Sequence, residues 1–137
     1  MASLREIQRK ILHFTVTIFA LNLLTTSVEA CRCLPPGEPK YELGRSALVF
    51  SGQVVNIEKA PGMIQRVTFK VLKTWKGHRK KRHVISISTD PEGCGYEFKN
   101  RKKYLVYASA EDSRLQVSIC SRTAPLEFAA DDIKGFK

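Results

Sequence analysis

The sequence of 137 residues lacks the short motifs that mark the common enzyme classes. It has no HExxH metal-binding helix motif, no GxGxxG dinucleotide loop, no phosphate-binding loop, and no serine nucleophile motif with a matching histidine and aspartate. The adjacent carboxylates Asp131 and Asp132 are better explained as surface charge than as a catalytic pair. We therefore expect a protein that is not an enzyme and that has no cofactor of its own.

The sequence also has no apolar run of the length that crosses a membrane. Its most apolar stretch, residues 11–24, holds about 14 residues, whereas a membrane-spanning helix needs about 20. A basic segment precedes this stretch, and small residues follow it up to Ala30. Because this order is typical of a secretory signal peptide, we expect residues 1–30 to be removed and residues 31–137 to form a secreted, extracellular domain. A retained membrane helix and a lipid-anchored N-terminus are the less favoured alternatives.

Acidic residues are few. The sequence has 13 Asp and Glu against 23 Lys and Arg, which gives a formal net charge of +10. A secreted cationic protein favours extracellular polyanions, and its export argues against a nucleic-acid partner. The most basic run contains Arg79, Lys80, Lys81 and Arg82, and residues 99–103 form a second one. The first run could bind a glycosaminoglycan or could be the solvated tip of a hairpin, and both alternatives stay open.

The cysteines number only four, Cys31, Cys33, Cys94 and Cys120. An even number of cysteines in a small secreted chain is typical of disulfides. A bridge between Cys31 and Cys33 would close a very small ring, so each is expected to pair with one of the two distant cysteines. A zinc site is disfavoured because the spacing lacks paired CxxC motifs. The spacing leaves open which distant cysteine pairs with which.

Short alternating apolar segments predict a mainly β protein. The strands are expected at residues 47–58, 65–75, 83–88, 103–109 and 115–120, with helical turns at 39–46 and a C-terminal helix over 123–135. Gly52, inside the first strand, predicts a bulge or bend. Five strands with this bend and a terminal helix favour a closed Greek-key barrel of the OB type, with a small sandwich as the alternative.

Several of these segments together resemble one family. The segment CRCLPPG begins at Cys31, and ALVFSGQVV, FKVLKTWKG and YLVYAS follow it in the predicted strands. The sequence from Cys31 onward thereby resembles the N-terminal, netrin-like domain of the tissue inhibitors of metalloproteinases. The resemblance implies an OB-like barrel, a monomer, and disulfides joining Cys31 to Cys94 and Cys33 to Cys120. It also implies a secreted metalloproteinase inhibitor.

The resemblance further implies a mechanism, which the chemistry of the N-terminus supports. After cleavage Cys31 would carry a free α-amino group, whose ordinary pKa of about 7.7–8.0 leaves a neutral fraction at physiological pH. Its nitrogen and the Cys31 carbonyl oxygen could chelate the zinc of a secreted or membrane-bound metalloendopeptidase and displace the catalytic water. The residues expected to contact the protease are Cys31, Arg32, Cys33, Leu34, Glu92 and Gly93.

Three departures from the family pattern shape the expectation. Members of the family carry a third disulfide in this domain and a second, cysteine-rich subdomain, so we expect a single-domain, shortened form here. Arg32 is unusual at its position, where members of the family usually have a small or uncharged residue that enters the specificity pocket of the protease. A long cation there suits a deep or acidic pocket. The alternative function is a non-inhibitory, netrin-like module that attaches to matrix polyanions such as glycosaminoglycans.

Overall fold

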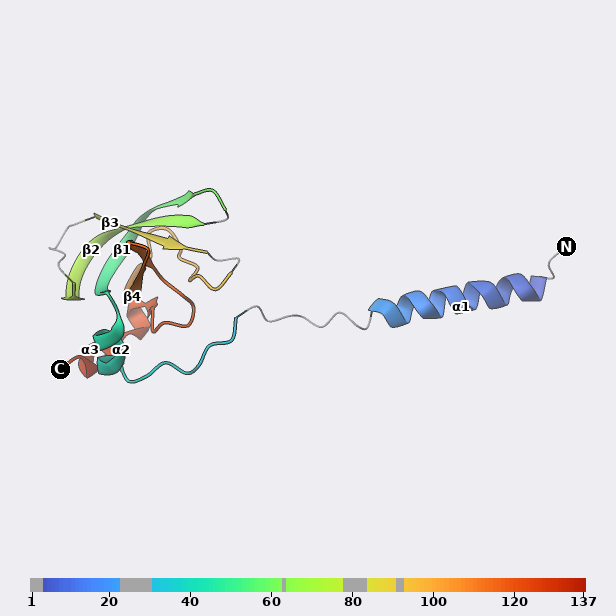
Figure 1. Cartoon of the computed structure of the whole chain (residues 1–137), viewed down its shortest axis with the longest axis horizontal. Coiled ribbons are helices and arrows are strands. Elements are labelled where there is room, and N and C mark those ends of the chain that lie inside the picture. The colour runs from blue at the N-terminus through green and yellow to red at the C-terminus, as the bar shows by residue number, and fades with distance from the viewer. Residues whose placement is uncertain (1–3, 23–30, 63, 78–83, 91–92) are drawn as a thin grey trace.

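The computed structural model describes residues 4–22, 31–62, 64–77, 84–90 and 93–137. Helix α1 precedes a β barrel, and two short helices, α2 and α3, lie side by side at the end of the barrel (Figure 1). The elements are α1 Leu4–Asn22, α2 Pro39–Arg45, β1 Leu48–Lys59, β2 Gln65–Lys76, β3 Val84–Thr89, β4 Lys103–Glu111, β5 Arg114–Gln116, β6 Ala124–Pro125, the 3-10 turn η1 Leu126–Phe128, and α3 Ala130–Gly135.

The predicted OB-like barrel is confirmed. The strand order is β1-β2-β3-β5-β4, and β4 also pairs with β1, which closes the barrel. All these pairings are antiparallel except that between β3 and β5, which is parallel at Ser88 and Gln116. The short strand β6 pairs with β4 through Tyr104 and Leu105. Closure leaves the barrel with no long free edge, which is how small β domains avoid pairing with other chains.

Strand β1 bends because it pairs with two strands at once. Its register against β2 shifts at three places, one of them between Ser51 and Gly52. A Cβ on Gly52 would lie 2.9 Å from the Phe50 ring and 3.2 Å from the carbonyl oxygen of Lys70. The predicted bend at this glycine is confirmed, and the close approach of the backbone explains why no side chain fits there.

Two apolar clusters form because alternate residues of each strand face opposite sides. Inside the barrel, Phe69 packs edge-on against both Phe50 and Phe98, and all three are buried. On the outer face, the second cluster contains buried Leu105 and Tyr107. The residues that cover this second cluster are Leu43, Trp75, Leu126, Ala129, Ile133 and Phe136. The two short helices therefore cover a second apolar core on the outer face of the barrel.

The C-terminal third differs from the prediction in two places. The predicted strand at 115–120 ends at Gln116, because the following residues bond to another loop instead: the Tyr96 N–H donates to the Val117 carbonyl at 3.1 Å. The predicted helix over 123–135 is divided into β6, η1 and α3. Thr123 fixes the extended part, since its Oγ1 accepts the Tyr107 N–H at 3.0 Å.

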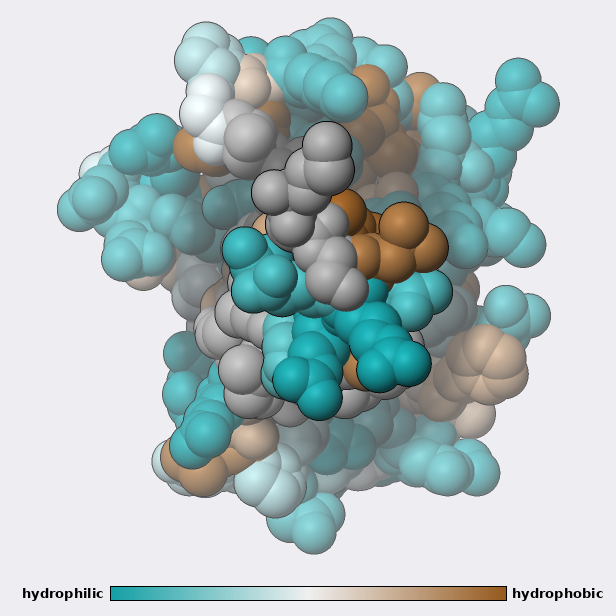
Figure 2. All heavy atoms as spheres, turned by 90° about the vertical axis from the view of Figure 1, so that its right-hand side faces the viewer, coloured by the Kyte–Doolittle hydropathy of each residue, from teal (hydrophilic) through white to brown (hydrophobic). Residues whose placement is uncertain are grey.

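Helix α1 lies apart from the barrel (Figure 1) and exposes apolar side chains such as Ile11 and Phe14. Within the described ranges, no helix combines the length and apolar character that crossing a membrane requires. On the side of the molecule where α1 lies, most of the coloured surface is hydrophilic and hydrophobic residues form separate patches (Figure 2).

Candidate functional site

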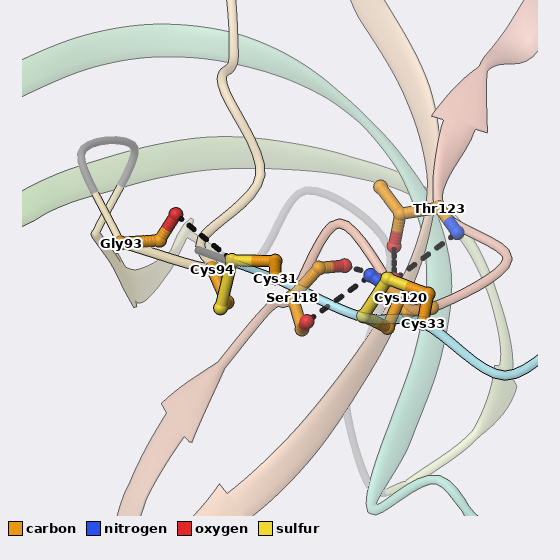
Figure 3. The surroundings of a disulfide bond; sticks show 8 residues. Cys31, Cys33, Gly93, Cys94, Ser118, Cys120 and Thr123 are labelled. Carbon is orange, nitrogen blue, oxygen red and sulfur yellow. Dashed lines mark hydrogen bonds between the residues drawn. A yellow bond between two sulfur atoms is a disulfide. The ribbon is translucent and has the colours of Figure 1, made fainter. Parts of the chain in front are cut away.

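Two disulfides hold the segment that follows Ala30. Cys31 is joined to Cys94 with 5.7 Å between the Cα atoms, and Cys33 is joined to Cys120 with 5.1 Å between them. The pairing that the family resemblance implied is therefore confirmed. The two bridges lie side by side along the arm, which we define as residues 31–38 (Figure 3). Two disulfides in a domain of this size fit an extracellular protein.

The two loops that receive the bridges are also joined to each other. The Ile119 N–H donates to the Cys94 carbonyl at 3.0 Å, and Gly95 forms an isolated β-bridge with Ser118. The loop carrying Cys94 and the loop carrying Cys120 consequently form one support. The arm is thus crosslinked twice, within three residues, to a single hydrogen-bonded surface.

The loop before Cys94 is closed by backbone contacts that sequence reasoning missed. The Asp90 carbonyl accepts the Gly93 N–H at 3.1 Å and the Gly95 N–H at 2.7 Å, and an Asp90 carboxylate oxygen accepts the Gly93 N–H at 3.1 Å. A Cβ on Gly95 would lie 2.1 Å from the Asp90 nitrogen. Only glycine fits at this position, and the Cys94-Gly95 dipeptide was the one signal in the sequence that could have indicated it.

This loop meets the first residue of the arm. The sulfur of Cys31 lies 3.4 Å from the Gly93 carbonyl oxygen (Figure 3). A disulfide sulfur has no hydrogen to donate, so we describe this as a van der Waals contact. The structure therefore places Gly93 beside the arm that carries residues 31–34, and the contact of these residues with a protease stays a prediction. Glu92 lies outside the described residues.

The arm presents its side chains to solvent. Arg32 and Cys33 are exposed, and Leu34 is 87% exposed. A groove of about 570 Å³ separates the arm from helix α2 and the end of β4, with Tyr41 and Ser109 among its lining residues. The arm is therefore held at its crosslinks and is accessible between them.

A further set of side chains joins the arm to the C-terminal helix. Arg122 donates from Nε and Nη2 to the two carboxylate oxygens of Asp132, at 2.8 and 2.6 Å, and from Nη1 to the Gly37 carbonyl at 2.9 Å. The Tyr107 hydroxyl donates to Asp132 at 2.7 Å. The interpretation of both terminal carboxylates as surface charge is wrong for Asp132, which is only 13% exposed. It holds for Asp131, which is 96% exposed.

The charge states of this set reinforce one another. Burial alone would raise the pKa of the Asp132 carboxyl, but the hydrogen bonds from Arg122 and Tyr107 and the charge of Arg122 hold that pKa below its ordinary value. Burial, followed by the bond to Asp132, raises the pKa of the Tyr107 hydroxyl. The bond to Asp132 raises the pKa of the Arg122 guanidinium. At neutral pH the set is a carboxylate, a neutral phenol and a cation, which makes its hydrogen bonds charge-assisted.

A second groove, of about 640 Å³, lies between the loop before β4 and the segment around β6. Its lining includes the cations Lys99, Arg101, Lys102 and Lys103 as well as Tyr96, Tyr104, Glu97 and Glu127. Within the described ranges none of the four cations is in an ion pair. The predicted polyanion patch at Arg79, Lys80, Lys81 and Arg82 lies outside the described residues.

Neither a protein-family model nor a curated protein matches this chain. In the part of the chain that the structure describes, no three His, Cys, Asp or Glu side chains cluster as metal ligands.

Proposed function

We propose that residues 31–137 form a secreted inhibitor of zinc metalloendopeptidases, related to the tissue inhibitors of metalloproteinases. The observation that carries the proposal is the double crosslinking of an exposed arm whose first residue is Cys31. A small barrel could be stabilised by disulfides placed anywhere. Two bridges within three residues, at the point where a signal peptide would be cut, instead stiffen one short terminal segment.

The chemistry needs only main-chain atoms of Cys31. Its sulfur is committed to the disulfide with Cys94, which leaves the α-amino nitrogen and the carbonyl oxygen as a bidentate pair. A zinc endopeptidase keeps one coordination position open for the water that attacks the substrate. A chelating amine and carbonyl at that position would expel this water, and hydrolysis would stop for lack of a nucleophile.

Stiffness accounts for the affinity that such a short segment would need. A mobile peptide loses conformational freedom when it binds, and each ordered residue costs about 1–2 kcal/mol of backbone entropy. The arm is already ordered by its bridges and by Pro35 and Pro36, whose rings restrict the backbone. Pre-ordering lowers the cost of association without adding any contact.

The neighbouring side chains would select the protease. Arg32 follows the chelating residue directly and is exposed, and the family resemblance implies that it would enter the first specificity pocket of the enzyme. Leu34 would occupy a neighbouring subsite, and Gly93, with Glu92, would form a second contact loop. A long cation at Arg32 favours enzymes with a deep or acidic pocket.

The test is inhibition of a panel of zinc endopeptidases by the secreted, processed chain. N-terminal sequencing should first show an unblocked Cys31. One alanine added before Cys31 should abolish inhibition, because it converts the amine into an amide, while the melting temperature stays unchanged. Alanine in place of Lys137, at the other terminus, is the matched control and should inhibit fully. Equal inhibition by the extended and unextended chains would contradict the proposal.

A second candidate function is attachment to matrix polyanions, and the basic groove favours it. Four cations without ion-pair partners in the described ranges line a space large enough for a sugar unit. The Lys99 to Lys103 loop is well supported, because Gln53 donates to the Arg101 carbonyl at 3.0 Å and the Arg101 N–H donates to the Val54 carbonyl at 3.0 Å. Sulfate groups would meet the cations, and sugar hydroxyls would meet the two carboxylates.

Heparin chromatography tests this second candidate. Glutamine at Lys99, Lys102 and Lys103 together should lower the elution salt more than glutamine at three exposed lysines elsewhere, Lys40, Lys59 and Lys70. Equal shifts for the two triple variants would show that net charge alone governs retention, and would remove the groove from consideration.

A further inference from the structure

The backbone of Gly37 is held from both sides, at the far end of the arm from Cys31. Its N–H donates to a Glu42 carboxylate oxygen at 2.9 Å, and its carbonyl accepts Arg122 Nη1 at 2.9 Å. A Cβ at this position would lie 2.6 Å from the Tyr41 ring, so a larger residue would have to displace the Tyr41 side chain. The arm therefore has a third attachment point beyond the two disulfides.

One short segment supplies two of the three attachments. Cys120 bonds to Cys33, and Arg122, two residues later, bonds to Gly37. Residues 33–37 and residues 120–122 consequently form a small closed ring, in which one link is a disulfide and the other is a guanidinium hydrogen bond. Leu34, which is 87% exposed and is the most exposed large apolar residue in the described part of the barrel domain, lies within this ring.

Arg122 is suited to this link because a guanidinium has five donors in one plane. Two of its nitrogens bind the Asp132 carboxylate in a fork, which leaves Nη1 aimed at the Gly37 carbonyl. The Tyr107 hydroxyl holds the same carboxylate from strand β4. Lysine has a single nitrogen and could not form the fork and reach Gly37 as well.

We propose that Arg122 is a positioning residue that sets the orientation of Leu34, and that the strength of inhibition depends on it. The proposal rests on the proposed inhibitory function. Cys31 keeps its own bridge to Cys94, so the chelating end stays in place when Arg122 is lost. Gly37 would then be held only through its N–H bond to Glu42, so residues 34–36 would be placed less firmly and the part of the affinity that Leu34 contributes would fall.

The experiment compares Arg122→Ala with Tyr107→Phe in the processed chain. Both variants remove one hydrogen-bonding group from the same set, but only the first removes the hydrogen bond to the Gly37 carbonyl. We expect Arg122→Ala to weaken inhibition about tenfold, chiefly through faster dissociation, and Tyr107→Phe to inhibit like the wild type although it melts lower. A loss of inhibition that merely follows the fall in melting temperature across both variants would overturn the proposal.

A double-mutant cycle gives a readout that a purely structural role would not produce. Leu34→Ala should weaken inhibition in the wild type and have little further effect in the Arg122→Ala background, because Leu34 is no longer oriented there. Additive effects of the two substitutions would contradict the positioning role. Arg122→Lys should behave like Arg122→Ala in this cycle.

Amide hydrogen exchange separates this proposal from the proposed function. Because only its bond to Glu42 would still hold Gly37 in Arg122→Ala, the Gly37 amide should exchange about tenfold faster there than in the wild type, and at the wild-type rate in Tyr107→Phe. If the wild type inhibits no protease, the inhibitory function fails and the role in inhibition fails with it, but faster exchange would still establish the link between Arg122 and the arm. If exchange at Gly37 is unchanged, the positioning role fails even where inhibition is observed.

Discussion

Trp75, the single tryptophan of the chain, lies against Phe136, with 5.4 Å between the ring centroids and 57° between the ring planes. Phe136 follows helix α3 directly and also meets the ring of Tyr107 edge-on, with centroids 6.0 Å apart. A residue next to the C-terminus therefore closes the outer core that strands β1, β2 and β4 begin. Because no other tryptophan contributes, the fluorescence of the chain reports on the docking of α3.

Phe136→Ala should consequently loosen α3 and expose Trp75 to water. We expect the emission maximum to shift to longer wavelength and the free energy of unfolding to fall by about 1–3 kcal/mol, as lost aromatic packing and burial predict. The matched control is Phe128→Ala, since Phe128 is 77% exposed and should leave both quantities unchanged. An unshifted emission spectrum in Phe136→Ala would mean that α3 does not cover the tryptophan.

Asp132→Asn should make the free energy of unfolding of the domain less dependent on pH in the acidic range. The folded-state pKa of Asp132 lies below its unfolded value, so its contribution is complete above the unfolded pKa of about 3.9 and is lost as the pH falls through the folded value. We expect the variant to be less stable than the wild type by about 1–3 kcal/mol near pH 6, because a charge-assisted hydrogen-bond set is broken. The difference in unfolding free energy between the wild type and Asp132→Asn should become smaller below about pH 4.

Thermal melts of both proteins between pH 2 and pH 7 provide the measurement. Asp131→Asn is the matched control, because its 96% exposed carboxylate forms only a surface ion pair with Lys134 and should change stability by less than about 0.5 kcal/mol. A gap between wild type and Asp132→Asn that stays constant down to pH 2 would show that the carboxylate form is not what stabilises α3.

The strands of the barrel could be predicted because the residue pattern that indicates each strand lies within that strand. Alternation over residues 65–75 indicated a strand, and the structure places β2 at Gln65–Lys76. Gly52 likewise marked its own bend. The disulfide pairing, by contrast, followed from the family resemblance and not from spacing. Arg122 could not be predicted at all, since the Gly37 carbonyl that it binds lies 85 residues earlier and no pattern links the two.

The fifth strand and the C-terminal helix were misplaced for a related reason. The apolar residues after Gln116 predict a continuing strand. The backbone of Val117 and Ile119 instead bonds to the loop at Cys94, which lies far away in the sequence. Thr123 similarly commits the next residues to strand β4 through the Tyr107 backbone. Tertiary hydrogen bonds override local preference in both segments.

Gly95→Ala should disturb the loop of residues 90–95, which carries the Cys94 end of the bridge to Cys31. The added methyl group would meet the Asp90 nitrogen at 2.1 Å, so the backbone of residues 90–95 would have to move and its hydrogen bonds to Asp90 would be lost. We expect a fall in unfolding free energy of about 1–3 kcal/mol and weaker protease inhibition, because Gly93 would leave its place beside Cys31.

Gly44→Ala, in helix α2, is the matched control for Gly95→Ala, because a Cβ on Gly44 meets no atom within 4 Å. It should leave inhibition unchanged and leave stability unchanged or slightly higher, since alanine is the better helix former. Thermal melts and inhibition constants of the two variants are compared. Wild-type inhibition by Gly95→Ala would show that the loop is not part of the contact surface.

Arg32→Ala should alter which protease is inhibited more than how stable the domain is. The side chain is exposed and has no ion pair within the described ranges, so its removal costs the fold little. A protease with a deep or acidic specificity pocket should be inhibited about tenfold less well, because a desolvated cation–carboxylate contact is lost. A protease with a shallow apolar pocket should be inhibited better, since the long cation no longer obstructs the site.

The measurement is the ratio of inhibition constants for one protease of each kind. Arg45→Ala, which removes a cation that borders the same groove beneath the arm, controls for charge and should leave the ratio unchanged. If both variants weaken inhibition of both enzymes equally, Arg32 attracts proteases through its charge alone and does not enter the specificity pocket.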